Sequence, residues 1–273
     1  MTSNSMLAYG AEFDFGLYEL TPRIRYMLAA LPRSGSTFFS HTLWETGLLG
    51  APLEYLNPSM NVEIRKRLGA DNDSTVYWAK LQQCRTSPNG AFGWKIFMSN
   101  YLTICKQEPG FVNRLAADKV IFLTRRDKFA QAVSTVLAIQ TKSWFSDIGR
   151  INQPYFSKQQ IEDMIITILI QEKFFEDLFV KAEADVYRVY YEDLKKNPDK
   201  ITNDILKWLN VQKEFDVDHR KPVKTPEIAP SRLNLTQDWS TKFVDEYFRG
   251  RSFTSSFPEL LSQSPGPDVS ARC

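Results

Sequence analysis

Short apolar runs alternate with longer amphipathic stretches along the chain. The runs at residues 24–31, 91–97, 119–124 and 186–190 have the length and composition of buried strands. Helix-like patterns lie between them, the longest over residues 159–184. Strands that alternate with helices of this length pair in parallel, because each helix returns the chain to the same edge of the sheet. The pattern predicts an α/β fold with a mostly parallel central sheet flanked by helices on both faces.

The same pattern sets the expected limits of the domain. Residues 1–22 read as an irregular lead-in, and residues 254–273 are rich in Ser and Pro, which is typical of a disordered tail. There is no internal repeat, so we expect residues 1–253 to form a single domain. Further helices are expected over residues 37–45, 61–84 (with a break at 71–74), 128–139, 201–209 and 237–248.

The composition narrows the functional classes. The 273 residues are 43% hydrophobic and 24% charged with a net charge of +2, so nothing global indicates a nucleic-acid partner. No apolar run reaches transmembrane length. Cys84, Cys105 and Cys273 are unclustered and odd in number, which favours reduced thiols in a cytoplasmic protein. Only His41 and His219 are available as histidines, so we expect no metal site.

Residues 32–37 form a turn rich in Gly and Ser between the first predicted strand and the first predicted helix. The first N–H groups of a helix are unpaired and lie at the positive end of its dipole, so such a turn can hold an anion. Gly35 permits close approach, Ser36 and Thr37 add hydroxyl donors, and Arg33 adds charge. No lysine follows Gly35, which disfavours a Walker A loop. Taken alone, an ordinary strand-to-helix turn is an equal alternative.

Two further groups follow predicted strands, where ligands of a parallel sheet bind. Arg125 and Arg126 end the strand at 119–124, and Ser134 lies on the next helix; together an arginine and a hydroxyl can hold a phosphate. Tyr191 ends the last strand. Solvated arginines that pair with neighbouring acids, and a packed tyrosine, are the plainer alternatives.

Taken together, these segments resemble the 3′-phosphoadenosine 5′-phosphosulfate (PAPS)-dependent sulfotransferases, and most closely the bacterial trehalose 2-sulfotransferase family. The resemblance covers roughly residues 24–250. The matching segments, in chain order, are residues 33–37, 46–55, 88–95, 125–134, 140–144, 191–198 and 237–249. Two positions depart from the family pattern. Residues 231–236 lack the expected basic pattern, and Ala51 stands where the trehalose enzymes carry an acid.

The resemblance implies a P-loop-like, sulfotransferase-like sandwich that moves the sulfuryl group of PAPS to a hydroxyl of a carbohydrate or glycolipid without a metal. Glu54 would be the general base, and desolvation in its apolar loop would strengthen it; a loop carboxylate that caps a backbone amide is the alternative. Lys95 would cover charge on the bridging oxygen, unless it is a solvated strand-end lysine. The implied donor-binding residues are Arg33, Ser34, Gly35, Ser36 and Thr37 at the 5′-phosphosulfate, Arg125 (with Arg126 as second choice) and Ser134 at the 3′-phosphate, and Tyr191 near the adenine.

Aromatic side chains are the candidates for an acceptor platform, because sugar faces pack on rings. We select Trp94 and Trp144, and core packing is the competing interpretation for each. The resemblance also leaves a homodimer open. Two other functions stay open: a P-loop-like nucleotide kinase, and a catalytically inactive nucleotide-binding or scaffold protein of the same fold.

Overall fold

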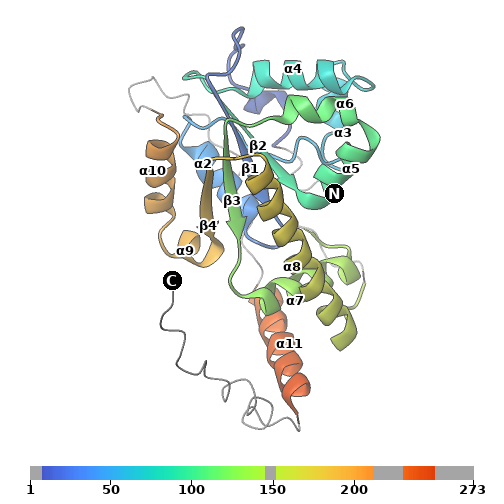
Figure 1. Ribbon diagram of the computed structural model, residues 1–273. Coiled ribbons are helices and arrows are strands. Elements are labelled where there is room, and N and C mark those ends of the chain that lie inside the picture. Colours follow the sequence, from blue (N-terminus) through green and yellow to red (C-terminus); the bar gives the residue numbers. More distant parts are fainter. Residues whose placement is uncertain (1–7, 145–151, 212–229, 250–273) are drawn as a thin grey trace, which may run out of the picture.

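The central sheet is parallel throughout. The computed structural model describes residues 8–144, 152–211 and 230–249, and its sheet has the strand order β2-β1-β3-β4 (Figure 1). The strands are β1 (Ile24–Ala30), β2 (Ala91–Phe97), β3 (Lys119–Thr124) and β4 (Val186–Tyr190). The predicted α/β class, with a mostly parallel sheet between helices, is confirmed.

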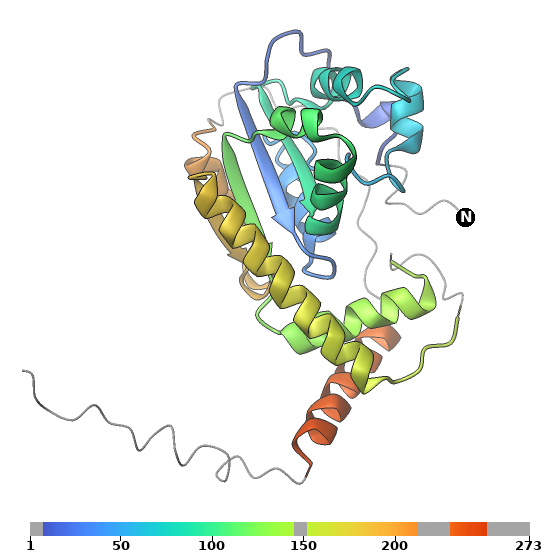
Figure 2. The ribbon, with the colours of Figure 1, turned by 45° about the vertical axis from the view of Figure 1, so that its right-hand side comes forward.

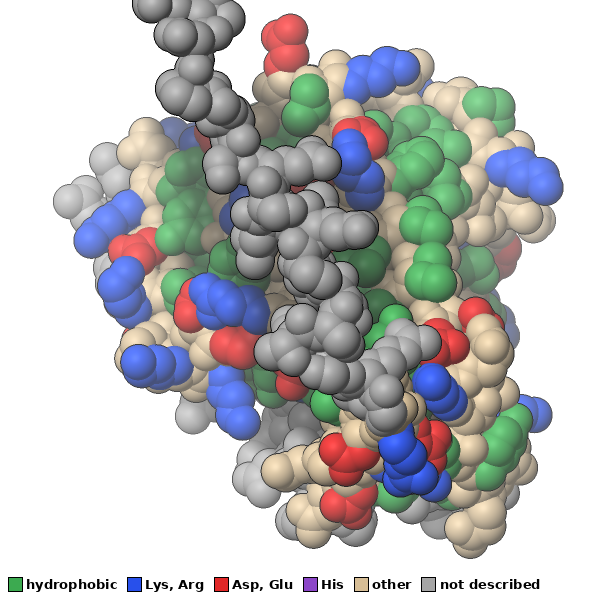
Figure 3. Space-filling view, turned by 60° about the horizontal axis from the view of Figure 1, so that its bottom comes forward, with side chains coloured by type: hydrophobic (Ala, Val, Ile, Leu, Met, Phe, Trp, Pro, Cys, Tyr) green, Lys and Arg blue, Asp and Glu red, His purple; other side chains and the backbone are tan. Residues whose placement is uncertain are grey.

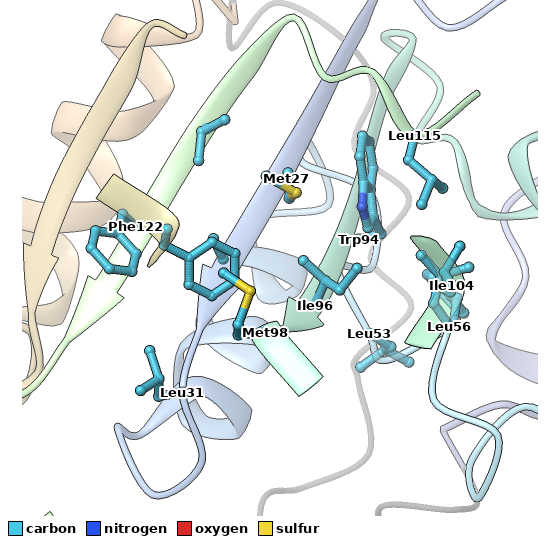
Figure 4. Packing of buried hydrophobic residues seen from close by; sticks show 14 of the residues in the cluster. Met27, Leu31, Leu53, Leu56, Trp94, Ile96, Met98, Ile104, Leu115 and Phe122 are labelled. Carbon is cyan, nitrogen blue, oxygen red and sulfur yellow. The ribbon is translucent and has the colours of Figure 1, made fainter. Parts of the chain in front are cut away.

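Alternate residues of each strand supply two separate cores, because successive side chains in a strand point to opposite faces. On one face, Tyr26 and Leu28 of β1 pack with residues of α2 (Ser36–Glu45) and α10 (Pro198–Trp208). On the other, Met27 of β1 and Phe122 of β3 belong to a larger core that includes residues of α7 (Lys128–Thr141) and α8 (Lys158–Lys181). Figure 2 shows α8 crossing this face of the sheet, and Figure 4 shows part of the packing in this larger core.

The remaining elements precede, connect or follow the strands. They are the 3₁₀ turns η1 (Ala11–Phe13) and η2 (Asn113–Leu115), and the helices α3 (Val62–Arg67), α4 (Ser74–Arg85), α5 (Met98–Gln107), α6 (Pro109–Val112), α9 (Tyr191–Lys196) and α11 (Pro230–Phe248). Helices α3 and α4 are separated where Asp73 accepts the N–H groups of Thr75 and Val76, which caps α4. None of the helices in the described ranges is long and apolar enough to span a membrane.

The segment before β1 is tied to the body of the protein. Tyr9 and Phe15 are buried, and the Phe15 N–H donates to the carbonyl of Cys84 at 2.9 Å. Asp14 forms ion pairs with both Arg67 and the fully buried Arg85. The segment is therefore part of the packed structure, although it is irregular apart from η1. The tail predicted over residues 254–273 lies outside the described residues.

Candidate active site

The turn at residues 32–37 depends on the conformational freedom of glycine. Gly35 precedes α2 with φ of 83°, in the left-handed region, and Arg33 has φ of 62°. A Cβ on Gly35 would lie 2.3 Å from Cδ2 of Tyr191, so the tyrosine ring lies directly against the turn. Left-handed non-glycine residues such as Arg33 are uncommon, and they cluster at ligand-binding turns.

The hydroxyls of this turn have different surroundings. The Ser34 side chain is buried, and its Oγ donates to the Leu31 carbonyl at 2.7 Å, so it stabilises the turn itself. Ser36 and Thr37 occupy the first turn of α2, and their backbone N–H groups belong to the unpaired set at a helix start. This half of the site has the arrangement of an anion cradle.

Arg33 joins the cradle to the segment that follows β3. Its Nε donates to Ser134 Oγ at 2.9 Å, and its Nη1 donates to the Trp144 carbonyl at 2.8 Å. Nearby, Nε2 of the buried Gln131 donates to the Pro32 carbonyl at 3.0 Å. The two segments that the sequence selected as phosphate-binding are therefore in direct contact, across about a hundred residues of chain.

The two arginines after β3 have different environments. Arg125 is mostly buried, with 18% of its side chain exposed, and its guanidinium lies 5.3 Å from the centre of the Tyr191 ring. Its Nε is buried and has no hydrogen-bond partner among the described residues; the nearest carboxylate oxygen, on Glu192, is 4.0 Å away. A buried donor of this kind normally has a partner. Arg125 is thus well placed to bind an anion beside Tyr191.

Arg126 is held on the surface by acids of α9. Its Nη1 and Nη2 donate to the two carboxylate oxygens of Asp193 at 2.8 and 2.6 Å, and its guanidinium covers the Tyr190 ring at 4.0 Å. The hydrogen bonds with Asp193 raise the pKa of Arg126, and the same contact lowers the pKa of Asp193. The N–H groups of Arg126 and Asp127 both donate to Glu192. Desolvation by burial raises the pKa of Glu192, but these hydrogen bonds to the ionised carboxylate outweigh it, and the pKa is lowered.

Glu54 and Lys95 form a buried ion pair beside the cradle. Lys95 is 3% exposed, and its Nζ lies 2.9 Å from Glu54 Oε1 and 3.3 Å from Thr37 Oγ1. The Glu54 loop reaches this position because Leu53 pairs with β2: the Lys95 N–H donates to the Leu53 carbonyl at 2.9 Å. The loop thereby covers the free edge of β2, which fixes Glu54 next to Lys95.

Two residues that hold Glu54 were not selected from the sequence. Asn57 donates from Nδ2 to Glu54 Oε2 at 2.7 Å, and the Tyr9 hydroxyl accepts the Glu54 backbone N–H at 3.1 Å. Asn57 lies three residues after Glu54 in a turn, a spacing that could have indicated it. Tyr9 is 45 residues away, and no local pattern connects it to this loop.

Trp94 is a correction to the predicted acceptor platform. It is completely buried in the core (Figure 4). Its ring lies edge-on to Trp78 at 5.3 Å and is stacked on Phe92 at 5.8 Å. A ring enclosed in the core cannot present a face to a sugar. Trp144 is 43% exposed, and its backbone carbonyl binds Arg33.

Figure 3 views the molecule toward the carboxyl ends of the strands. Lys and Arg side chains lie next to Asp and Glu on the visible surface rather than forming one basic field. The cationic groups of the site are instead local, at Arg33, Lys95 and Arg125. No group of three or more His, Cys, Asp or Glu side chains that could hold a metal occurs within the described ranges, and the expectation of metal-free chemistry stays a prediction.

The order and spacing of these segments match a known family. Residues 25–247, more than half of the chain, match the family model described as Stf0 sulphotransferase. The chain belongs to the Stf0 sulphotransferase family. This agrees with the predicted resemblance to sulfotransferases, and it establishes the enzyme class of the chain.

Two curated relatives are similar to this Stf0 sulphotransferase over most of their length. The trehalose 2-sulfotransferase of Mycolicibacterium smegmatis is 23% identical over 82% of this chain and 94% of the relative. The trehalose 2-sulfotransferase of Mycobacterium tuberculosis is 26% identical over 81% and 93%. Among solved structures, the sulfotransferase domain from the Synechococcus PCC 7002 olefin synthase is 15% identical over 85% of this chain and 98% of that chain, with a TM-score of 0.40, a level from which no conclusion follows.

Proposed function

We propose that this sulfotransferase moves the sulfuryl group of PAPS to a hydroxyl of a carbohydrate or glycolipid by in-line displacement. The observation that carries the proposal is the placement of Lys95, within 2.9 Å of Glu54 Oε1 and 3.3 Å of Thr37 Oγ1. A carboxylate and an ammonium group thus lie beside an anion cradle. The two trehalose 2-sulfotransferase relatives support a sugar hydroxyl as the acceptor.

The donor would extend between the two anion-binding segments. The cradle, residues 33–37, takes the 5′-phosphosulfate through backbone N–H groups and the hydroxyls of Ser36 and Thr37. Arg125 and Ser134 take the 3′-phosphate, because the buried Nε of Arg125 makes no hydrogen bond within the described residues and Ser134 touches the cradle through Arg33. Arg126 is the weaker candidate, since Asp193 already binds its guanidinium. Tyr191, between Gly35 and Arg125, contacts the nucleoside.

In the reaction, the acceptor oxygen forms a bond to sulfur while the bond between sulfur and the bridging phosphate oxygen breaks. The acceptor proton passes to the Glu54 carboxylate, and adenosine 3′,5′-bisphosphate leaves with the bonding electron pair. A lysine ammonium has three N–H donors. Glu54 and Thr37 engage two of those on Lys95, and the third is available for the bridging oxygen, where negative charge develops. Catalysis is then mainly positioning and charge stabilisation, as in phosphoryl transfer.

Two alternatives are less well supported. A nucleotide kinase would need a Walker lysine after Gly35, and serine stands there. A catalytically inactive binding protein would have no use for the buried Glu54–Lys95 pair, which is costly to desolvate. The acceptor platform reduces to Trp144, which is exposed beside Arg33. A homodimer, the absence of nucleic acid and a cytoplasmic location stay predictions from the sequence.

Calorimetric titration tests the donor assignment. The protein should bind adenosine 3′,5′-bisphosphate at least about tenfold more tightly than ATP or adenosine 5′-phosphate, because a buried arginine contact is worth roughly 1.5–3 kcal/mol. Glu54→Gln should keep this affinity and lose most sulfate transfer. Asp185→Asn is the matched control, because Asp185 pairs with Lys119 at 3.0 Å at the amino ends of the strands. Tighter binding of ATP would contradict the proposal in favour of a kinase.

A further inference from the structure

A segment outside the region matched by the family reaches the catalytic loop. The match begins at residue 25, whereas Tyr9 lies sixteen residues earlier. The Tyr9 side chain is buried, and its hydroxyl accepts the Glu54 N–H at 3.1 Å. Its ring packs edge-on against Tyr55, the residue after Glu54, at 5.9 Å between centroids. Tyr9 therefore contacts the backbone of the Glu54 loop rather than the Glu54 carboxylate.

The segment is locked in place by a buried arginine. Arg85, which is fully buried, donates to the carbonyls of Ala8 and Gly10 at 3.1 and 3.0 Å, on either side of Tyr9. Its Nε lies 3.0 Å from Asp14 Oδ1, and Arg67 binds the same carboxylate at 2.6 Å. Releasing the segment would leave the Arg85 charge buried and unpaired, which is strongly unfavourable. Tyr9 is thus held at a fixed position.

Glu54 is in turn held at four points. Its N–H donates to Tyr9, and its carbonyl accepts the Asn57 N–H at 3.0 Å. Its carboxylate oxygens accept from Lys95 at 2.9 Å and from Asn57 at 2.7 Å. Of these four, only the Tyr9 contact comes from outside the loop and its strand partner. Burial raises the pKa of Tyr9 well above its usual value, so the phenol stays neutral and serves as a fixed acceptor.

We propose that Tyr9 is a positioning residue, which orients the Glu54 backbone so that the carboxylate faces the acceptor hydroxyl. In this chain, the segment before β1 is then a functional part of the active site. The inference rests on the proposed role of Glu54 as the general base. Misplacing a reacting group by even a fraction of an ångström slows the chemical step, while binding of the donor, held by other residues, is unaffected.

The test is Tyr9→Phe, which keeps the ring and removes the acceptor of the Glu54 N–H. With labelled PAPS and the best acceptor from a panel that includes trehalose, kcat should fall about tenfold while the KM for PAPS stays within about twofold. The dissociation constant of adenosine 3′,5′-bisphosphate should not change. Deleting the segment before β1 is a poorer test, because it would leave the Arg85 charge buried without its partners and unfold the protein.

Tyr26→Phe is the matched control. Tyr26 is fully buried, and its hydroxyl donates to the Leu49 carbonyl at 2.7 Å rather than bonding to Glu54. This variant should lower Tm by a similar amount and keep the wild-type kcat. If both variants lose turnover in proportion to their loss of Tm, Tyr9 acts only through stability and the inference is overturned.

A double-mutant cycle separates this inference from the proposed function. In a Glu54→Gln background, Tyr9→Phe should cause no further loss of turnover, because its effect passes through the carboxylate. Independent, multiplying losses would overturn the positioning role. If Glu54→Gln itself keeps wild-type turnover, the base assignment fails and the inference with it. If Glu54→Gln is inactive and Tyr9→Phe is fully active, only the inference fails.

Discussion

Replacing Gly35 by alanine would test how the cradle is built. The new Cβ would lie 2.3 Å from Cδ2 of Tyr191, more than 1 Å inside a carbon–carbon contact of about 3.5–4.0 Å. The left-handed φ of 83° adds strain of roughly 1–2 kcal/mol for a residue with a Cβ. The tyrosine ring must therefore move or the turn must open, and either change displaces groups that we assign to the donor.

Gly69→Ala supplies the matched control. Gly69 also has a left-handed φ, of 57°, but the nearest atom to a Cβ there is the flexible Lys80 Nζ at 3.8 Å. Both variants should therefore lose about 1–2 kcal/mol of unfolding free energy from backbone strain, measured by urea denaturation. Only Gly35→Ala should weaken binding of adenosine 3′,5′-bisphosphate, by at least about tenfold in calorimetry. Wild-type affinity in Gly35→Ala would refute the assignment of this turn and of Tyr191 to the donor.

Three further predictions address single side chains. Arg125→Ala should weaken adenosine 3′,5′-bisphosphate about tenfold or more and leave adenosine 5′-phosphate unchanged, whereas Arg126→Ala should stay within about twofold in the same titrations. Because Arg126 lowers the pKa of Asp193, the ionised acid stabilises the fold above its unfolded pKa of about 3.9, and this contribution is lost as pH falls through the lowered value. The Tm deficit of Asp193→Asn should accordingly be present at pH 7 and disappear as pH falls below the unfolded pKa in thermal scans. Trp144→Ala should raise the acceptor KM about threefold or more without changing the KM for PAPS; equal acceptor KM values would remove Trp144 from the site.

The sheet could be predicted because its strands are short, apolar and bounded by turns. β1 and β3 are buried on both faces, so their sequences are continuous apolar runs. The separation of α3 from α4 was also visible, since Asp73 is a strong N-cap. The last helix starts at Pro230, earlier than the expected residue 237, and a proline is compatible with the first turn of a helix.

The contacts among the proposed site segments were predictable where they follow strand ends and not where they depend on distant packing. The cradle, Arg125 and Ser134 occur in local segments, and parallel topology brings such segments together. Trp94 was assigned wrongly because the aromatic content of β2 does not reveal which rings are enclosed, and Trp78 and Phe92 enclose this one. The Tyr9 contact joins an irregular segment to a loop 45 residues later, and periodicity carries no information about such a contact.

Sulfate transfer from labelled PAPS to a panel of sugars and glycolipids tests the central claim most directly. The wild-type protein should label at least one hydroxyl-bearing acceptor in the panel. Glu54→Gln and Lys95→Ala should lose most of this transfer, at least about a hundredfold, while Asp185→Asn keeps it. Binding of adenosine 3′,5′-bisphosphate with no transfer to any acceptor would contradict the account and indicate an inactive nucleotide-binding protein. Undiminished transfer by Glu54→Gln would contradict the assignment of the general base.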